Sequence, residues 1–180
     1  AQTAPAPRAS NSGAVGTPTG GGGTSHGYHD STSGATGANV FGINLSGDYS
    51  TTIGGPYYLT MGPINLTGYT GTQLRFKRWL NTDYPPYVYA TIDVSNDGIN
   101  WSNLFTNPSG VEIAENAWTT QTYALGAAMD NKPAVYVRWG HRVASSGAFA
   151  YSGWNIDDVE MLGSSMGPIP PAITTSSPLP

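Results

Sequence analysis

Residues 87–95, YVYATIDVS, alternate between polar and apolar side chains, and this period of two is the strongest constraint on what the chain can fold into. An extended strand sends successive side chains to opposite faces, so such a segment has one apolar and one polar face. A strand with one apolar face must bury it against a second layer. The inward side chains expected here are Val88, Ala90, Ile92 and Val94.

The same alternation recurs along the middle of the chain, and no stretch shows a convincing helical period. The dipeptide Asp97-Gly98, which follows the strand at 87–95, is typical of a β-hairpin turn. Eight or nine short strands with long connections predict an all-β fold, a two-sheet antiparallel β-sandwich of the jelly-roll type. Strands are expected at 39–45, 57–62, 72–80, 87–95, 101–105, 118–125, 134–141, near 147–151 and in the stretch that begins at 151.

Charge and cysteine content exclude several classes of function. The chain carries a net charge of −4 with only seven Lys and Arg, which argues against a nucleic-acid partner. It has no cysteine, so disulfides, thiol catalysis and thiolate metal sites are excluded. No apolar run approaches the roughly 20 residues that span a membrane, so membrane insertion is not expected. An end such as Ala-Gln-Thr-Ala-Pro fits a removed signal peptide or a boundary within a longer chain, and we expect an extracellular or cell-surface location.

The composition divides the chain into three parts. Residues 1–25 are rich in Ala, Pro, Gly, Ser and Thr and are expected to be flexible or docked on a partner. Residues 26–163 are expected to form the β-sandwich domain. Residues 164–180 are Pro-rich and are expected to be an extended tail or linker. The predicted architecture is therefore a sandwich with extended N- and C-terminal arms.

The alternation breaks within WNIDDVEM, where two adjacent acids occupy a strand. Trp154 and Ile156 share one parity, whereas Val159 and Met161 take the other. One extra residue at the acid pair, as in a β-bulge, would explain the change. Such a bulge would turn at least one carboxylate sideways.

Several motifs together resemble a family of secreted bacterial jelly-roll modules. The stretches are SGWNIDDV, GINLSGDY, LTMGPINLTGYTGTQLRFKRWL and VSNDGINW, with Arg138-Trp-Gly upstream of the W-x-I-D-D-V motif. The resemblance covers residues 28–162. It extends to MAM-like domains, the reelin-repeat sandwich and the C-terminal domains of immune-inhibitor-A-type metallopeptidases. Such modules accompany secreted peptidases, glycoside hydrolases and large surface proteins.

The resemblance implies a structural Ca²⁺ near the acid pair. Asp157 is the first candidate ligand, joined by Asp30 and Asp48 from early loops and by Asp158, because Ca²⁺ takes six to eight oxygen ligands. The alternative from the residues alone is that one acid caps a turn and the other pairs with Arg138 or Arg142. Both interpretations stay open at this point.

The sequence shows no catalytic constellation. The two adjacent acids face opposite ways on a regular strand, so without a bulge they cannot be the facing carboxylates of a glycosidase. The aromatic loop DYPPYVYA offers flat rings that could stack on sugars, and the candidate ligand-binding residues are Tyr84, Tyr87 and Tyr89. The alternative is that these tyrosines only decorate the solvent side of a sandwich.

Two functions remain, and neither is an enzyme. The first is a structural module of a cell-surface or secreted assembly, with copies of itself or other surface domains as partners. Docking of the arms onto a neighbouring sheet edge would order them and could propagate as a filament. The alternative is a carbohydrate- or substrate-binding accessory module of a larger secreted hydrolase or peptidase, with a polysaccharide as partner.

Overall fold

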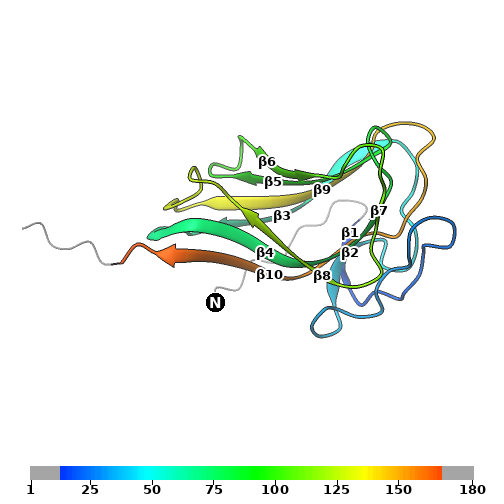
Figure 1. Cartoon of the computed structure of the whole chain (residues 1–180), viewed down its shortest axis with the longest axis horizontal. Coiled ribbons are helices and arrows are strands. Elements are labelled where there is room, and N and C mark those ends of the chain that lie inside the picture. The colour runs from blue at the N-terminus through cyan, green and yellow to red at the C-terminus, as the bar shows by residue number, and fades with distance from the viewer. Residues whose placement is uncertain (1–12, 168–180) are drawn as a thin grey trace, which may run out of the picture.

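Ten β-strands form two antiparallel sheets in the computed structural model, which describes residues 13–167 (Figure 1). The expected all-β sandwich is therefore confirmed. The outer parts of the two expected arms, 1–12 and 168–180, lie outside the described residues. Within the described part, no helix is long and apolar enough to cross a membrane.

Sheet A has the order β1-β2-β10-β4, and two short strands both pair with β4. Its strands are β1 (Gly13–Gly16), β2 (Val40–Ile43), β10 (Gly153–Ser165), β4 (Tyr69–Thr82), β7 (Ile113–Ala114) and β8 (Thr119–Ala124). Sheet B has the order β3-β9-β5-β6. Its strands are β3 (Gly54–Ile64), β9 (Val135–Val143), β5 (Val88–Ser95) and β6 (Ser102–Thr106). The chain repeatedly crosses between the sheets, as in a jelly roll.

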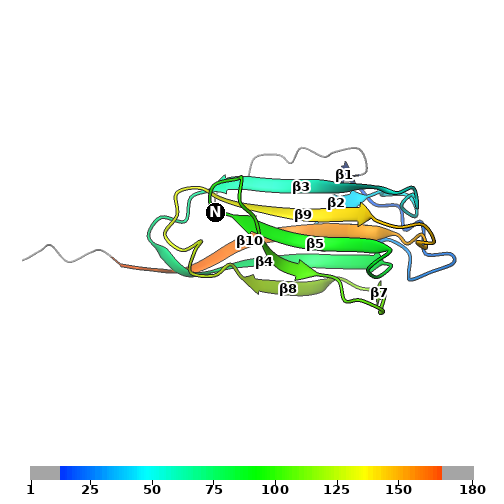
Figure 2. The same ribbon diagram turned by 90° about the horizontal axis from the view of Figure 1, so that it is seen from above.

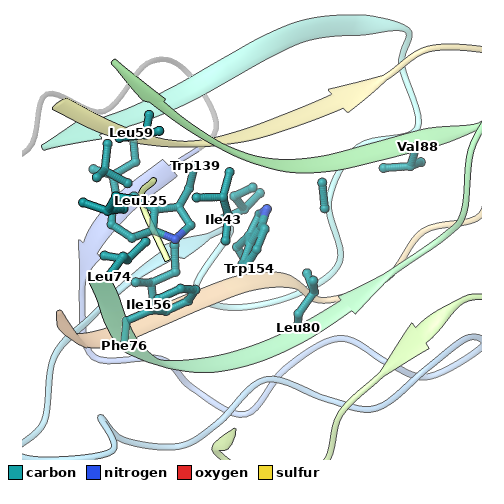
Figure 3. Close-up of a cluster of buried hydrophobic side chains, with 14 of the residues drawn as sticks. Ile43, Leu59, Leu74, Phe76, Leu80, Val88, Leu125, Trp139, Trp154 and Ile156 are labelled. Carbon is teal, nitrogen blue, oxygen red and sulfur yellow. The ribbon is translucent and has the colours of Figure 1, made fainter. Parts of the chain in front are cut away.

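The core lies between the two sheets and is made by the inward faces that the alternation predicts. The four apolar residues of β5 are fully buried, and Trp139 of β9 and Trp154 of β10 are almost so. The rings of Phe76 and Trp139 meet edge to face, with centroids 5.4 Å apart. Figure 3 shows side chains of both sheets filling this layer.

The bulge expected at the acid pair is present. Asp157 pairs with Lys77 of β4 and Glu160 pairs with Arg75, so β10 holds one residue more than its partner over this interval. Asp158 has a φ of 47°, a left-handed conformation that matches an inserted residue. The bulge lets Trp154 and Ile156 on one side of it, and Val159 and Met161 on the other, pack against the same core.

Two details differ from the sequence-based expectations. The strand expected near 147–151 is wrong, because this segment is a turn and loop between β9 and β10. Its backbone instead bonds to other loops: Phe149 N donates to Asp83 Oδ2 at 2.9 Å. In addition, β1 lies within the segment 1–25 and β10 extends to Ser165.

His141 of β9 is buried beside an aromatic ring. Its side chain is only 3% exposed, and its ring centroid lies 4.6 Å from that of Tyr49. Its Nε2 atom has no hydrogen-bond partner among the described residues. Burial lowers the pKa of His141 to about 4, so it is neutral in the folded protein at neutral pH.

This buried histidine should make the fold sensitive to acid. The pKa of His141 in the folded state lies below the unfolded value of 6.5. The contribution of the neutral ring to the free energy of unfolding is therefore intact above pH 6.5 and is lost as pH falls toward 4. When pH is lowered from 7 to 4.5, the free energy of unfolding of His141→Leu should therefore rise by about 2–3 kcal/mol relative to that of wild type. Denaturant melts at both pH values measure this change. A difference between the two proteins that does not vary with pH would contradict the assignment.

Candidate functional site

The outer face of sheet B is rich in aromatic and planar polar side chains, and we call it the sheet-B face. Figure 2 looks onto this sheet, with β3, β9 and β5 in front of β10 and β4. Directly paired residues of neighbouring strands share a face, so the registers define its members. They are Tyr58 and Thr60 of β3, Tyr136, Arg138, Gly140 and Arg142 of β9, Tyr89, Thr91, Asp93 and Ser95 of β5, and Asn103 and Thr106 of β6.

Arg138 lies at the centre of this face between two aromatic rings. Its guanidinium carbon is 3.9 Å from the ring centroid of Tyr58 and 4.0 Å from that of Trp101. Its Nε donates to Asp93 Oδ2 at 2.9 Å, while Asn103 Nδ2 donates to the other carboxylate oxygen at 2.9 Å. Two cation–π contacts and an ion pair therefore fix the orientation of the guanidinium.

Glycine places the Tyr58 ring in this stack. Gly140 lies opposite Tyr58 on β9, and a Cβ at that position would be 2.8 Å from Tyr58 Cε1 and 2.5 Å from Thr91 Oγ1. No larger residue fits there without a shift. The missing side chain lets the tyrosine ring lie across β9, where it reaches the neighbouring Arg138.

The hairpin between β5 and β6 places Trp101. Asp97 Oδ1 accepts hydrogen bonds from Ile99 N and Asn100 N, at 2.8 and 2.7 Å, and its Oδ2 accepts from Asn100 Nδ2 at 2.7 Å. The hydrogen bonds, first from the Asn100 side chain, hold the pKa of Asp97 below its usual range. The turn is thus closed by its own side chain, and the next residue, Trp101, folds over Arg138.

The structure separates the three tyrosines proposed from the sequence. Tyr89 lies on the sheet-B face opposite Arg142. Tyr84 and Tyr87 lie in the loop between β4 and β5, with perpendicular rings 5.6 Å apart, and Tyr87 also packs against the core. The loop pair is therefore distinct from the sheet-B face.

The aspartates proposed as one calcium site also fall into two places. Asp157 and Asp158 hold the loop at Thr36: its backbone N donates to Asp157 Oδ2 at 3.2 Å, and its hydroxyl donates to Asp158 Oδ1. Asp30 is instead fully buried against Asn155 of β10, whose Nδ2 donates to Asp30 Oδ1 at 2.6 Å. No group of three His, Cys, Asp or Glu side chains within residues 13–167 could together hold a metal ion.

Asp30, its neighbour Ser31 and its hydrogen-bond partner Asn155 each carry a buried oxygen atom without a partner in the described part of the chain. These atoms are Asp30 Oδ2, Asn155 Oδ1 and Ser31 Oγ. Asp48 is close enough to act on the charge of Asp30. We call these three oxygens the Asp30 cradle; carboxylate, amide and hydroxyl oxygens are of the kind that Ca²⁺ takes as ligands.

Burial makes the Asp30 carboxyl hard to ionise. Desolvation raises its pKa to about 7, although the hydrogen bond from Asn155 acts in the opposite direction, and the Asp48 carboxylate raises it further. A bound cation would reverse this effect by stabilising the ionised form.

Sequence reasoning did not identify Arg138, Trp101 and Asn103 as one group, or Asn155 as the partner of Asp30. The parity of β5 did place Asp93 and Tyr89 outward, and Arg138 follows from the parity of β9. The partners in β6 and in the early loop could not be found this way, because their positions depend on strand register and loop path.

Comparisons with known proteins support the fold. No protein-family model and no curated protein sequence matches the chain. A solved structure of carbohydrate-binding modules from the β-sandwich superfamily aligns with a TM-score of 0.50 and 12% identity, covering 87% of this chain and 56% of the other. The match thus spans little more than half of that chain, and at this identity it shows the shared β-sandwich fold alone.

Two further solved structures align with lower scores. The K2 cleaved adhesin domain of Lys-gingipain has a TM-score of 0.42 and 16% identity, covering 71% of this chain and 73% of that domain. TmCBM61 in complex with β-1,4-galactotriose has a TM-score of 0.41 and 10% identity, covering 72% and 74%.

Asp30 should make stability depend on pH when no divalent cation is present. Its folded pKa of about 7 exceeds the unfolded value of 3.8, so the free energy of unfolding should fall as pH rises from about 4 to about 7. Asp30→Asn should remove this component. Denaturant melts of both proteins in chelator across this range provide the measurement, and a constant difference between them would refute the assignment.

Proposed function

We propose that the chain is a non-catalytic, extracellular carbohydrate-binding module that holds its ligand on the sheet-B face. The Tyr58–Arg138–Trp101 stack carries this proposal. Aromatic rings offer flat apolar surfaces to sugar rings, and fixed planar polar groups offer hydrogen bonds to hydroxyls. A shared fold does not imply a shared function, so the argument rests on the side chains of this face.

The rest of the face has the properties that such a ligand requires. Tyr89 and Tyr136 add further rings at its two ends, and the Tyr58 ring lies over Gly140 at its centre. Asn103 and Arg138 are oriented by Asp93, which reduces the entropy cost of forming hydrogen bonds with a ligand. A flat face of this kind suits an extended polymer better than a small molecule.

The non-catalytic assignment is supported by the engagement of the candidate acids and bases. Asp157 and Asp158 hold Thr36, and Asp93 holds Arg138. His141 is buried in the core, and the His26 ring stacks on Phe149 with centroids 4.1 Å apart. Each of these groups already has a structural role.

We also propose that the Asp30 cradle binds a structural Ca²⁺. Asp30 and Ser31 come from the early loop and Asn155 from β10, so the ion would fasten this loop to sheet A. The loop is also tied by backbone bonds, since Asp30 N donates to Gly21 O at 2.9 Å. The expected role is stabilisation rather than chemistry.

The filament-subunit hypothesis stays a prediction. It depends on the segments 1–25 and 164–180, and much of both lies outside the described residues. Gly13–Gly16 pairs with β2 of the same chain, so its own domain orders this part of the arm. The sheet-B face gives the carbohydrate-binding alternative a specific basis, and we therefore favour it.

Substitutions on the sheet-B face should weaken binding to polysaccharides. Tyr58→Ala and Trp101→Ala should each reduce affinity by about 5- to 30-fold, as expected for aromatic anchors at a binding site. Tyr84→Ala, in the separate loop, is the matched control and should bind like wild type. Affinity electrophoresis against a polysaccharide panel measures the effect, and a loss confined to Tyr84→Ala would place the ligand on the loop instead.

Calcium should raise the melting temperature through Asp30. A ligand bound only by the native state stabilises it by mass action, so chelation should lower the melting temperature of wild type. Asp30→Asn should abolish this response, whereas Asp157→Asn should keep it because Asp157 holds the loop at Thr36. Thermal melts with calcium and with chelator test both variants, and a response lost only in Asp157→Asn would support the acid-pair site instead.

A further inference from the structure

We infer that the polysaccharide bound by the sheet-B face is acidic, and that Arg138 receives the carboxylate of a uronic acid. This inference rests on the proposed function and specifies its ligand. It follows from which atoms of Arg138 are engaged, which are open, and what surrounds them.

Arg138 makes only part of the contacts that its guanidinium group can make. The two rings cover both faces of the group, and Asp93 takes Nε. Its two terminal nitrogens donate no hydrogen bond among the described residues, although the side chain remains 21% exposed. One edge of a rigid guanidinium group is therefore available to a ligand.

A second arginine of the same protein shows what a purely structural pair looks like. Arg78 is 9% exposed, and both its Nε and Nη2 donate to the carboxylate of Glu115, with Nη2 at 2.6 Å from Oε1. Asp93 does not hold Arg138 in this way, because its second oxygen is bound by Asn103. The network therefore orients Arg138 and engages only its Nε donor.

The open edge suits a planar oxyanion. Two parallel N–H groups match the two oxygens of a carboxylate, and such paired bonds are among the strongest in proteins. Because aromatic rings and Asp93 already fix the group, little conformational entropy is lost when the ligand binds.

The charges of the face favour the same ligand. Arg142 lies on the same face of β9 four residues further on, about 13 Å away at the usual rise of a strand. It is exposed, and the Tyr58 ring, which lies across Gly140, is between the two arginines. Asp93 is the one carboxylate among the described members of the face, so the face is locally positive although the chain carries −4. Two cations on a flat aromatic surface match a polymer that bears repeated carboxylates.

The test compares an acidic polysaccharide with its own carboxyl-reduced form. Polygalacturonate, alginate and hyaluronate, each with the reduced counterpart, are offered to the full chain in titration calorimetry. We expect the acidic form to bind at least tenfold more tightly than the reduced form. Arg138→Lys keeps the positive charge but loses the two parallel N–H donors of the guanidinium group, so it should weaken binding of the acidic form about tenfold.

Two further variants separate binding from folding. Arg142→Gln, at an exposed position, should weaken binding severalfold with an unchanged melting temperature. Arg75→Gln, which breaks an exposed pair with Glu160 on the other sheet, is the control and should bind like wild type. Binding of the acidic polymers that survives both Arg138→Lys and Arg142→Gln would overturn the inference.

The remaining outcomes distinguish the inference from the proposed function. Equal binding of acidic and reduced polymers, with loss in Trp101→Ala, would refute the acidic ligand but keep the carbohydrate-binding module. Binding of DNA as tight as that of polygalacturonate would also refute it, because it would show general anion binding. No binding to any acidic, reduced or neutral polymer would contradict the proposed function itself.

Discussion

The apolar layer between the two sheets determines which side chains of each strand point outward, toward solvent. Trp139 and Trp154 reach into it from opposite sheets and fix the parity of β9 and β10. Once the inward residues of a strand are set, its outward residues are set as well, because a shift of one position would expose the core. The line of Tyr136, Arg138 and Arg142 on the outer face is thus a consequence of packing on the inner face. The binding chemistry that we propose depends on this parity.

Two local exceptions to regular strand geometry complete the arrangement. On sheet B, a missing side chain at Gly140 lets Tyr58 lie flat beside Arg138, and the closed turn at Asp97 brings Trp101 to the other side. On sheet A, the bulge at Asp158 turns the acid pair toward the loop at Thr36. That loop belongs to the early segment that also carries Asp30 onto β10. The adjacent acids therefore hold the N-terminal loop in place, while the buried Asp30 carboxyl lies against Asn155, two residues before Asp157 on β10.

The sequence was sufficient for the sandwich, because strict alternation at 87–95 leaves a strand one way to bury its apolar side. It also located the bulge, since the parity change between Ile156 and Val159 requires one extra residue. The pairing of Asp30 with Asn155 was out of reach, because 125 positions separate them and only the loop path brings them together. The stack on Arg138 was equally hidden, since it joins side chains of β3, β9 and the turn before β6. The strand expected near 147–151 was wrong because its backbone bonds to the loop at Asp83 rather than to a strand.

The central claim is that the sheet-B face is where the ligand binds. The most direct test is a titration of the isotopically labelled chain with a uronic-acid oligosaccharide, followed by nuclear magnetic resonance. Our account predicts that the largest shifts occur at the terminal N–H groups of Arg138 and the indole N–H of Trp101, with smaller ones along Tyr89 and Thr91. Shifts centred on Tyr84 and Tyr87, or on the outer face of sheet A, would contradict it.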